Sequence, residues 1–259
     1  MPHAHLNGID IHYEDRGQGP PVLLTHGYGA TGAMWRPQVD ALTDRYRLIT
    51  WDMRGHGGTE SPEDPAAYSE ALTVEDMRAL LLHLGVRRAV VGGLSLGGYM
   101  SLAFWLAHPE MVRALVLCDT GPGYRNPAGR EQWNQMAERR AVALEEGGVR
   151  ALGSSTEVTE TARLHRSAQG LAHAARGMLK QFDSRVIEAL PRIDVPVLIL
   201  VGERDQPFLA PSDYMERAIP GARKVVVPAA GHAANLDNPE AFNAALLAFL
   251  DGLGPAGEG

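Results

Sequence analysis

Near its middle the chain carries the stretch Val90-Val91-Gly92-Gly93-Leu94-Ser95-Leu96-Gly97-Gly98-Tyr99. Its opening apolar run predicts a buried strand, and the apolar-rich sequence that follows predicts a helix. The pattern Gly93-x-Ser95-x-Gly97 therefore lies on a sharp strand-to-helix turn, where small neighbours let the two elements approach. Such a turn exposes the Ser95 hydroxyl and leaves the Leu96 N–H unpaired at a helix N-terminus. The stretch thus predicts a nucleophile, Ser95, with Leu96 as an oxyanion donor.

The composition is that of an ordinary globular chain. Its 259 residues are 45% hydrophobic and 21% charged, enough core material for one large α/β domain or two small ones. The net charge of −7, without any Lys/Arg run, argues against a nucleic-acid partner. The single cysteine, Cys118, favours a reducing compartment and a core role. Because no signal-peptide or membrane-spanning run occurs, we expect a cytoplasmic protein without a membrane partner.

Short apolar runs alternate with helical patterns along most of the chain. After a hairpin around Asn7-Gly8, strands are predicted at residues 22–25, 47–51, 89–91, 114–118, 195–201 and 223–227. This alternation predicts a mostly parallel sheet with helices on both faces. On the hairpin, His3, His5 and His12 lack acidic or cysteine partners at ligand spacing, so we expect solvated strand histidines and no metal.

Between residues 121 and 189 the strand signals disappear. Helices are predicted at Glu131–Glu146 and Thr159–Phe182, and an earlier helix is predicted to begin at Thr73 as its N-cap. We assign residues 1–122 and 186–259 to the core and residues 123–185 to a helical cap, or lid. Four apolar side chains of the cap could line a substrate entrance, although packing onto the core is the favoured role for most: Trp133, Met136, Met178 and Leu179.

Two loops that follow predicted strands carry polar residues and glycine. In His26-Gly27-Tyr28-Gly29 the glycines allow close approach to a ligand, so Tyr28 can offer its backbone N–H as a second oxyanion donor. A plain strand-exit turn is equally consistent with this loop alone, and Ser95 downstream favours the functional interpretation. In the loop 52–57 we expect Asp52 and Arg54 to hold backbone groups, and His56 is a less favoured candidate base.

Later in the chain, Asp205 and His232 each follow a predicted strand. Carboxyl ends of parallel strands meet at one edge of a sheet, so Ser95, Asp205 and His232 can converge there. Because a serine hydroxyl is too weak an acid to ionise at neutral pH, His232 would take its proton, and Asp205 would orient the imidazole. Asp119 is a rival acid. Asp205 is preferred because Gly202 permits a tight turn before it.

With these motifs in this order, the chain resembles the α/β-hydrolase superfamily. The matching pieces are His26-Gly27-Tyr28-Gly29, the loop 52–57, Gly93–Gly98, Gly202-Glu203-Arg204-Asp205 and Gly231-His232. The resemblance implies an eight-stranded, mostly parallel sheet with a cap after the sixth strand. It also supports the Ser95, Asp205 and His232 triad with Tyr28 and Leu96 as oxyanion donors, and it implies no cofactor.

Within the superfamily, the serine nucleophile departs from haloalkane dehalogenases and epoxide hydrolases, which use aspartate there. Size and cap resemble small microbial esterases and 3-oxoadipate enol-lactonases, and are similar to carbon–carbon bond hydrolases of meta-cleavage products and cofactor-free haloperoxidases. Fold resemblance does not select among these activities.

Hydrolysis of small or medium carboxylic esters through an acyl-enzyme is the leading hypothesis. A lactone or a carbon–carbon bond is the alternative, for which the cap would have to anchor a carboxylate through Arg125, Arg130, Arg139 or Arg140. A non-catalytic receptor that binds a small molecule is a third possibility. The expected partner in the first two cases is a small-molecule ester or lactone. The oligomeric state is not predicted.

Overall fold

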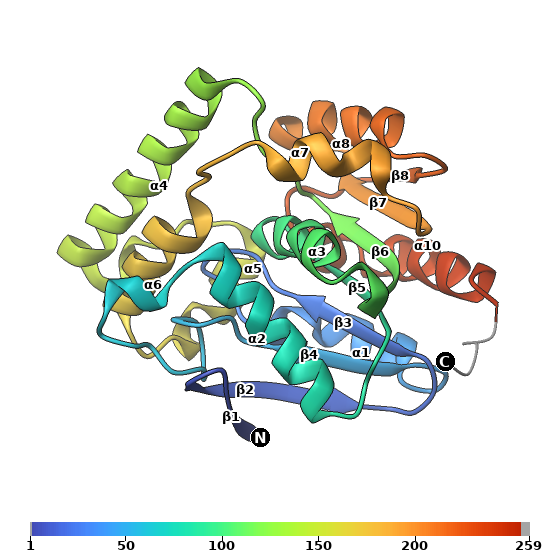
Figure 1. Cartoon of the computed structure of the whole chain (residues 1–259), viewed down its shortest axis with the longest axis horizontal. Helices are drawn as coiled ribbons and strands as arrows, with labels where there is room; N and C mark the ends of the chain where they lie inside the picture. Colours follow the sequence, from blue (N-terminus) through green and yellow to red (C-terminus); the bar gives the residue numbers. More distant parts are fainter. Residues whose placement is uncertain (1, 255–259) are drawn as a thin grey trace.

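The computed structural model describes residues 2–254 of the chain, and these form one eight-stranded sheet (Figure 1). The strand order is β1-β2-β4-β3-β5-β6-β7-β8. The pairs β1–β2 and β2–β4 are antiparallel and the other pairs are parallel, so the predicted fold class is confirmed. The strands are β1 (His3–Leu6), β2 (Ile9–Arg16), β3 (Pro21–Thr25), β4 (Arg47–Trp51), β5 (Ala89–Leu94), β6 (Val112–Cys118), β7 (Val197–Gly202) and β8 (Arg223–Val227).

Helices cover both faces of the sheet because strand side chains alternate between two apolar clusters. In β3, Leu23 belongs to one cluster, whereas Val22 and Leu24 belong to the other. One face is covered by α2 (Glu70–His83), α3 (Leu96–Ala107), α7 (Arg185–Ala189) and α8 (Gln206–Ala218). The opposite face is covered by α1 (Arg36–Leu42), α9 (Ala234–Asp237) and α10 (Pro239–Gly252). Cys118 is a buried core residue, as predicted.

Three further helices, α4 (Pro127–Gly147), α5 (Thr156–Thr161) and α6 (Ala168–Ala174), lie between β6 and β7. In Figure 1, α4 extends well beyond the sheet. Residues 2–254 also contain short 3-10 turns and one π-helical turn: η1 (Gly32–Trp35), η2 (Pro65–Ala67), η3 (Pro109–Met111), η4 (Gly148–Ala151), η5 (Ala162–Leu164), the π turn η6 (Ala175–Leu179) and η7 (Leu190–Arg192).

Two predicted helices differ from the structure. The start at Thr73 is wrong, because the Ser69 side chain accepts from the Leu72 N–H and caps α2 one turn earlier. The single helix Thr159–Phe182 is also wrong. It breaks where the His165 imidazole bonds Gly29 in the core, and Ser167 then caps a new helix.

The segment 123–185, our proposed cap, is fastened to the core by polar contacts. The Tyr28 hydroxyl donates to the Leu171 carbonyl at 2.9 Å, and the Thr156 hydroxyl donates to Asp237 at 2.8 Å. A side chain at Gly55 would place its Cβ 2.6 Å from the Gly170 carbonyl oxygen, so backbone meets backbone there. These contacts hold the segment over the carboxyl ends of the strands.

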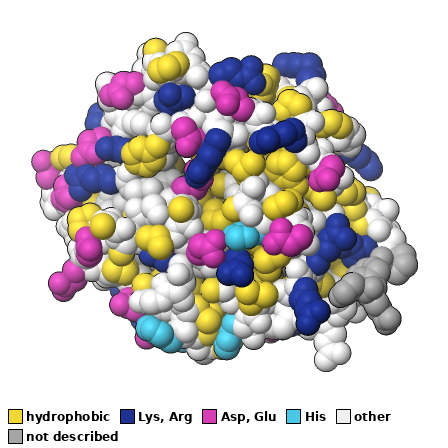
Figure 2. Space-filling view, viewed as in Figure 1, with side chains coloured by type: hydrophobic (Ala, Val, Ile, Leu, Met, Phe, Trp, Pro, Cys, Tyr) yellow, Lys and Arg dark blue, Asp and Glu magenta, His cyan; other side chains and the backbone are white. Residues whose placement is uncertain are grey.

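The surface carries both signs of charge. Figure 2 shows Lys and Arg side chains interspersed with Asp and Glu on the face it presents. Each helix within residues 2–254 is too short or too polar to cross a membrane.

The hairpin histidines differ in part from the prediction. His5 is exposed, but His12 is largely buried, with its Nδ1 3.0 Å from Asp52 Oδ2. The carboxylate lies there because Asp52 directly follows β4, which pairs with β2 in the sheet. Within residues 2–254, groups of three or more potential metal ligands are absent.

A buried ion pair offers a test of the packing beneath the loop 52–57. Arg54 donates twice to Asp76 at 2.7 Å, with both side chains at most 2% exposed. Removal of one partner leaves an uncompensated buried charge, so Asp76→Ala should lower the free energy of unfolding by about 3–5 kcal/mol in urea titrations. The control is Asp15→Ala, which breaks the Asp15–Arg47 pair at the surface, where the two side chains are 24% and 27% exposed, and should cost at most about 1 kcal/mol. Equal losses would contradict this explanation.

Candidate active site

Polar residues gather at one edge of the sheet because each follows a parallel strand. Ser95 follows β5, Asp119 follows β6 and Asp205 lies just beyond β7. His232 comes shortly after β8. The structure thereby brings together the three residues that the sequence proposes as a triad, since Ser95, Asp205 and His232 line the same cavity.

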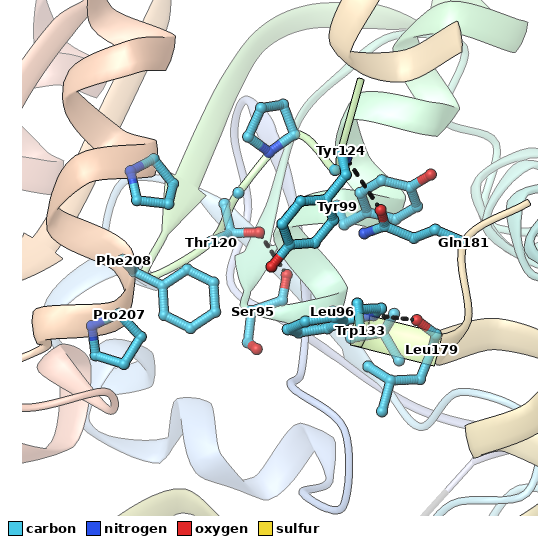
Figure 3. Close-up of a pocket in the computed structure, with 14 residues that line it drawn as sticks. Ser95, Leu96, Tyr99, Thr120, Tyr124, Trp133, Leu179, Gln181, Pro207 and Phe208 are labelled. Atoms are coloured by element: carbon cyan, nitrogen blue, oxygen red, sulfur yellow. Dashed lines mark hydrogen bonds between the residues drawn. The ribbon is translucent and has the colours of Figure 1, made fainter. Parts of the chain in front are cut away.

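Ser95 has a backbone conformation that few residues other than glycine adopt. Its φ is 54° and its ψ is −115°. Such strain costs about 1–3 kcal/mol and persists only where surrounding structure enforces it. Here the Ser95 N–H donates to the Cys118 carbonyl at 2.9 Å, and the Ser95 carbonyl accepts from the Thr120 hydroxyl at 2.6 Å (Figure 3).

Glycines on either side of Ser95 are required by close backbone contacts. A Cβ on Gly93 would lie 2.5 Å from the Thr25 carbonyl oxygen, and a Cβ on Gly97 would lie 2.7 Å from that of His26. Both distances are shorter than real Cβ contacts allow. Strand β3 therefore presses against the turn, which holds Ser95 at the end of β5.

His232 is oriented by Asp205. Its Nδ1 lies 2.8 Å from Asp205 Oδ2, and its ring stacks on Phe208 with 4.9 Å between the centroids. Because an ionised carboxylate only accepts hydrogen bonds, we assign the proton to Nδ1, which leaves the Nε2 lone pair free. Gly202 makes the tight turn that the sequence predicts: a Cβ there would lie 2.6 Å from the Ala230 carbonyl oxygen.

Asp119, the rival acid, has a different partner. Its Oδ1 accepts from the Gly202 N–H at 2.7 Å, and its Oδ2 lacks a hydrogen bond within the described residues. Burial, and then the charge of Asp205, raise the pKa of Asp119 well above its usual range. Burial therefore favours the neutral form of Asp119, and its Oδ1 ties β6 to the turn before Asp205.

The loop 26–29 packs beside the serine turn. A Cβ on Gly27 would lie 3.5 Å from the Ser95 Cβ. His26 Nδ1 donates to the Gly27 carbonyl at 2.7 Å, and its Nε2 accepts from Met53. Since a trans peptide is planar, fixing the Gly27 carbonyl also fixes the direction of the Tyr28 N–H. Within residues 2–254, the N–H groups of Tyr28 and Leu96 donate to no other residue.

Two chambers meet at Ser95. The aromatic chamber, about 160 Å³, contains Leu96 and is walled by apolar rings, among them Tyr99 and Tyr124 (Figure 3). The polar chamber, about 510 Å³, contains Tyr28, Asp205 and His232. Trp133, Leu179, Pro207 and Phe208 line both chambers.

The cap side chains have mixed roles. Trp133 and Leu179 line both chambers and Met136 lines the polar one, whereas Met178 is buried in the core cluster. Of the four arginines considered for anchoring a carboxylate, Arg140 alone lines either chamber. Phe208 and Glu157 also line the polar chamber and were missed, because neither lies in a recognisable motif.

The loop 52–57 is structural. Asp52 accepts from the Gly32 and Gly58 N–H groups at 2.7 and 2.8 Å, which confirms its predicted backbone-holding role. Arg54 holds the Ala67 carbonyl as well as Asp76. His56 is fully buried and lines neither chamber.

Comparisons with known proteins agree with this architecture. Residues 22–245 match a family described as "Alpha/beta hydrolase family". The pimeloyl-[acyl-carrier protein] methyl ester esterase of Vibrio vulnificus is 28% identical, over 93% of this chain and 98% of its own. A thermophilic esterase from Thermogutta terrifontis has a TM-score of 0.83 and 30% identity, covering 95% of this chain and 94% of its own. The enol-lactonase from Burkholderia xenovorans LB400 has a TM-score of 0.84 and 28% identity, covering 96% and 100%.

Backbone strain at Ser95 predicts a stability difference between two variants that lack the hydroxyl. Ser95→Gly relieves the strain, whereas Ser95→Ala keeps the Cβ and therefore the strain. The greater unfolded-state entropy of glycine offsets part of this gain. We therefore expect Ser95→Gly to be more stable than Ser95→Ala by about 1 kcal/mol in urea unfolding. An alanine variant as stable as the glycine variant would show that the turn is unstrained.

The neutral state of His26 predicts acid sensitivity. Burial lowers the pKa of His26 from 6.5 to about 4. In the unfolded chain His26 therefore binds a proton below about pH 6.5, whereas in the folded chain it binds one only below about pH 4. Because the unfolded state binds more protons between these values, the free energy of unfolding decreases as pH falls from about 6.5 to about 4. From pH 7 to pH 5, His26 should remove about 2 kcal/mol of unfolding free energy, measured by urea titration at each pH.

The matched variant for this pH dependence is His26→Gln, which should show a smaller loss between pH 7 and pH 5 whatever its absolute stability. Ser95→Ala retains every histidine and should keep the slope of the unmodified protein. An unchanged slope in His26→Gln would rule out this assignment.

Proposed function

The chain belongs to the alpha/beta hydrolase family, and from this premise we propose that it is a serine hydrolase that cleaves carboxylic esters of small or medium size. The observation that carries the proposal is the convergence of a strained serine with a histidine–carboxylate pair in one chamber. The similarity to two esterases supports ester bonds as the target.

In the proposed mechanism Ser95 Oγ attacks the ester carbonyl carbon while its proton passes to His232 Nε2. The carbonyl π electrons move onto oxygen, and the Tyr28 and Leu96 N–H groups receive that oxyanion. One such donor typically contributes about 10²–10³ in rate. Asp205 stabilises the imidazolium through Nδ1.

The tetrahedral intermediate collapses by breaking the bond to the alcohol oxygen, which takes the proton from His232. Water then attacks the acyl-enzyme with His232 as base, and the carboxylic acid leaves as Ser95 regains its proton. No step of this mechanism requires a metal or a cofactor.

The chambers suggest how an ester would lie. His232 must reach the departing alcohol, and it lines the polar chamber but not the aromatic one. We therefore place the alcohol part in the polar chamber and the acyl chain against Tyr99 and Tyr124 in the aromatic chamber. Leu96 lines the aromatic chamber and Tyr28 the polar chamber, so the two proposed oxyanion donors flank the carbonyl between them.

The assignment of roles is tested by hydrolysis of p-nitrophenyl butyrate. Ser95→Ala should abolish turnover, and Asp205→Asn should lower kcat by about 10³–10⁴-fold because the imidazole loses its orientation and charge partner. Asp119→Asn is the matched control. Because Asp119 bonds the Gly202 N–H and Asp205 bonds the His232 ring, an amide of the same shape at position 119 should change kcat by less than about tenfold. Undiminished turnover in Ser95→Ala would overturn the proposal, and a larger loss in Asp119→Asn than in Asp205→Asn would exchange the acids.

Lactone hydrolysis is the second candidate. Similarity to an enol-lactonase and the presence of Arg140 in the polar chamber favour it. A higher kcat/KM for a lactone bearing a free carboxylate than for p-nitrophenyl butyrate would select this function.

A further inference from the structure

The polar chamber contains a buried carboxylate with an unused oxygen. Glu157 is 3% exposed, and its Oε1 accepts from the Ser155 hydroxyl at 2.5 Å. Its Oε2 has no hydrogen-bond partner among the described residues and is shielded from bulk solvent. Because buried polar atoms are nearly always hydrogen-bonded, we expect this oxygen to accept a hydrogen bond from a group outside the described residues. Glu157 lines the chamber, so a rotation of its carboxylate would bring Oε2 to a bound molecule that supplies the donor.

The same chamber contains a cation without a carboxylate partner. The Arg140 guanidinium lies 5.9 Å from the centre of the Tyr28 ring, and no ion pair or hydrogen bond engages it within residues 2–254. Arg176 and Lys180 of the cap are paired with glutamates, whereas the exposed Arg139 and Arg140 have no ion pair within residues 2–254. Arg140 differs from Arg139 because it lines the chamber. Arg140 can therefore present its planar fork to an anion, for which a carboxylate has matching geometry.

From these two groups we propose that the polar chamber selects an alcohol that carries both a carboxylate and a further hydroxyl or ammonium donor. Arg140 binds the carboxylate, and Glu157 Oε2 accepts from the donor. The proposed substrate is thus an ester whose alcohol part is a small hydroxy acid. This inference rests on the proposed ester hydrolysis. Both groups share the chamber with His232, which protonates the departing alcohol.

Four butyrate esters of similar size separate the contributions. They are 3-butyryloxy-2-hydroxypropanoate, with donor and carboxylate; 3-butyryloxypropanoate, with carboxylate alone; 2,3-dihydroxypropyl butyrate, with donors alone; and propyl butyrate, with neither. We expect kcat/KM, measured by pH-stat, to be highest for the first and lowest for the last. Each charge-assisted contact should contribute on the order of tenfold to a hundredfold.

Matched variants assign the two contacts. Arg140→Gln should reduce the advantage of the esters with a carboxylate, and Glu157→Gln should reduce that of the esters with a donor. The controls are Arg139→Gln and Glu160→Gln, exposed neighbours on the same helices that line neither chamber. Both controls should keep the selectivity of the unmodified protein.

Product inhibition tests the inference without any variant. Glycerate should compete with propyl butyrate at a lower concentration than 3-hydroxypropanoate or glycerol does. Equal kcat/KM for all four esters, or selectivity changes as large in the controls as in the chamber variants, would overturn this inference while ester hydrolysis stands. A folded protein that hydrolyses none of the four would instead refute the proposed function.

Discussion

The site depends on the contact between backbone groups at the serine turn. Because Gly93 and Gly97 have no side chains, the Thr25 and His26 carbonyls at the end of β3 can lie directly against the start of α3. This contact forces Ser95 into a backbone conformation with positive φ, which directs its hydroxyl out of the end of the strand. Two hydrogen bonds stabilise the strained turn from its other side. The Ser95 N–H donates to β6, and the Thr120 hydroxyl donates to the Ser95 carbonyl.

Much of the architecture could be predicted because it is encoded locally. Apolar runs of strand length, bounded by turns, predict the six strands of the parallel part of the sheet with nearly correct bounds. The position after each strand indicates which polar residues meet. Asp205 could be preferred over Asp119 from Gly202 alone, and the structure supplies the physical difference. Asp205 bonds His232, whereas Asp119 bonds a backbone N–H.

The residues that we propose to carry specificity are positioned by tertiary contacts, which makes them harder to predict. Nothing in the sequence distinguishes Glu157 from other acidic residues of a polar helical segment, or Arg140 from Arg139 beside it. Their proposed roles depend on which side of a helix faces the chamber, and that depends on where the helices end. The predicted helix Thr159–Phe182 illustrates the difficulty, since the side chain of His165 breaks it by bonding a distant loop.

Two histidines, His26 of the core and His165 of the cap, hold the loop that carries the proposed Tyr28 donor. His26 donates to the Gly27 carbonyl, which belongs to the peptide whose N–H is the proposed Tyr28 donor, and His165 of the cap donates to the Gly29 carbonyl at 2.8 Å. Both rings must be neutral, since each also accepts a backbone N–H, and burial lowers the pKa of each. An oxyanion donor is effective only if it is fixed before reaction. The cap therefore supports the position of the proposed donor as well as the walls of the chambers, so its removal would disturb the reaction centre itself.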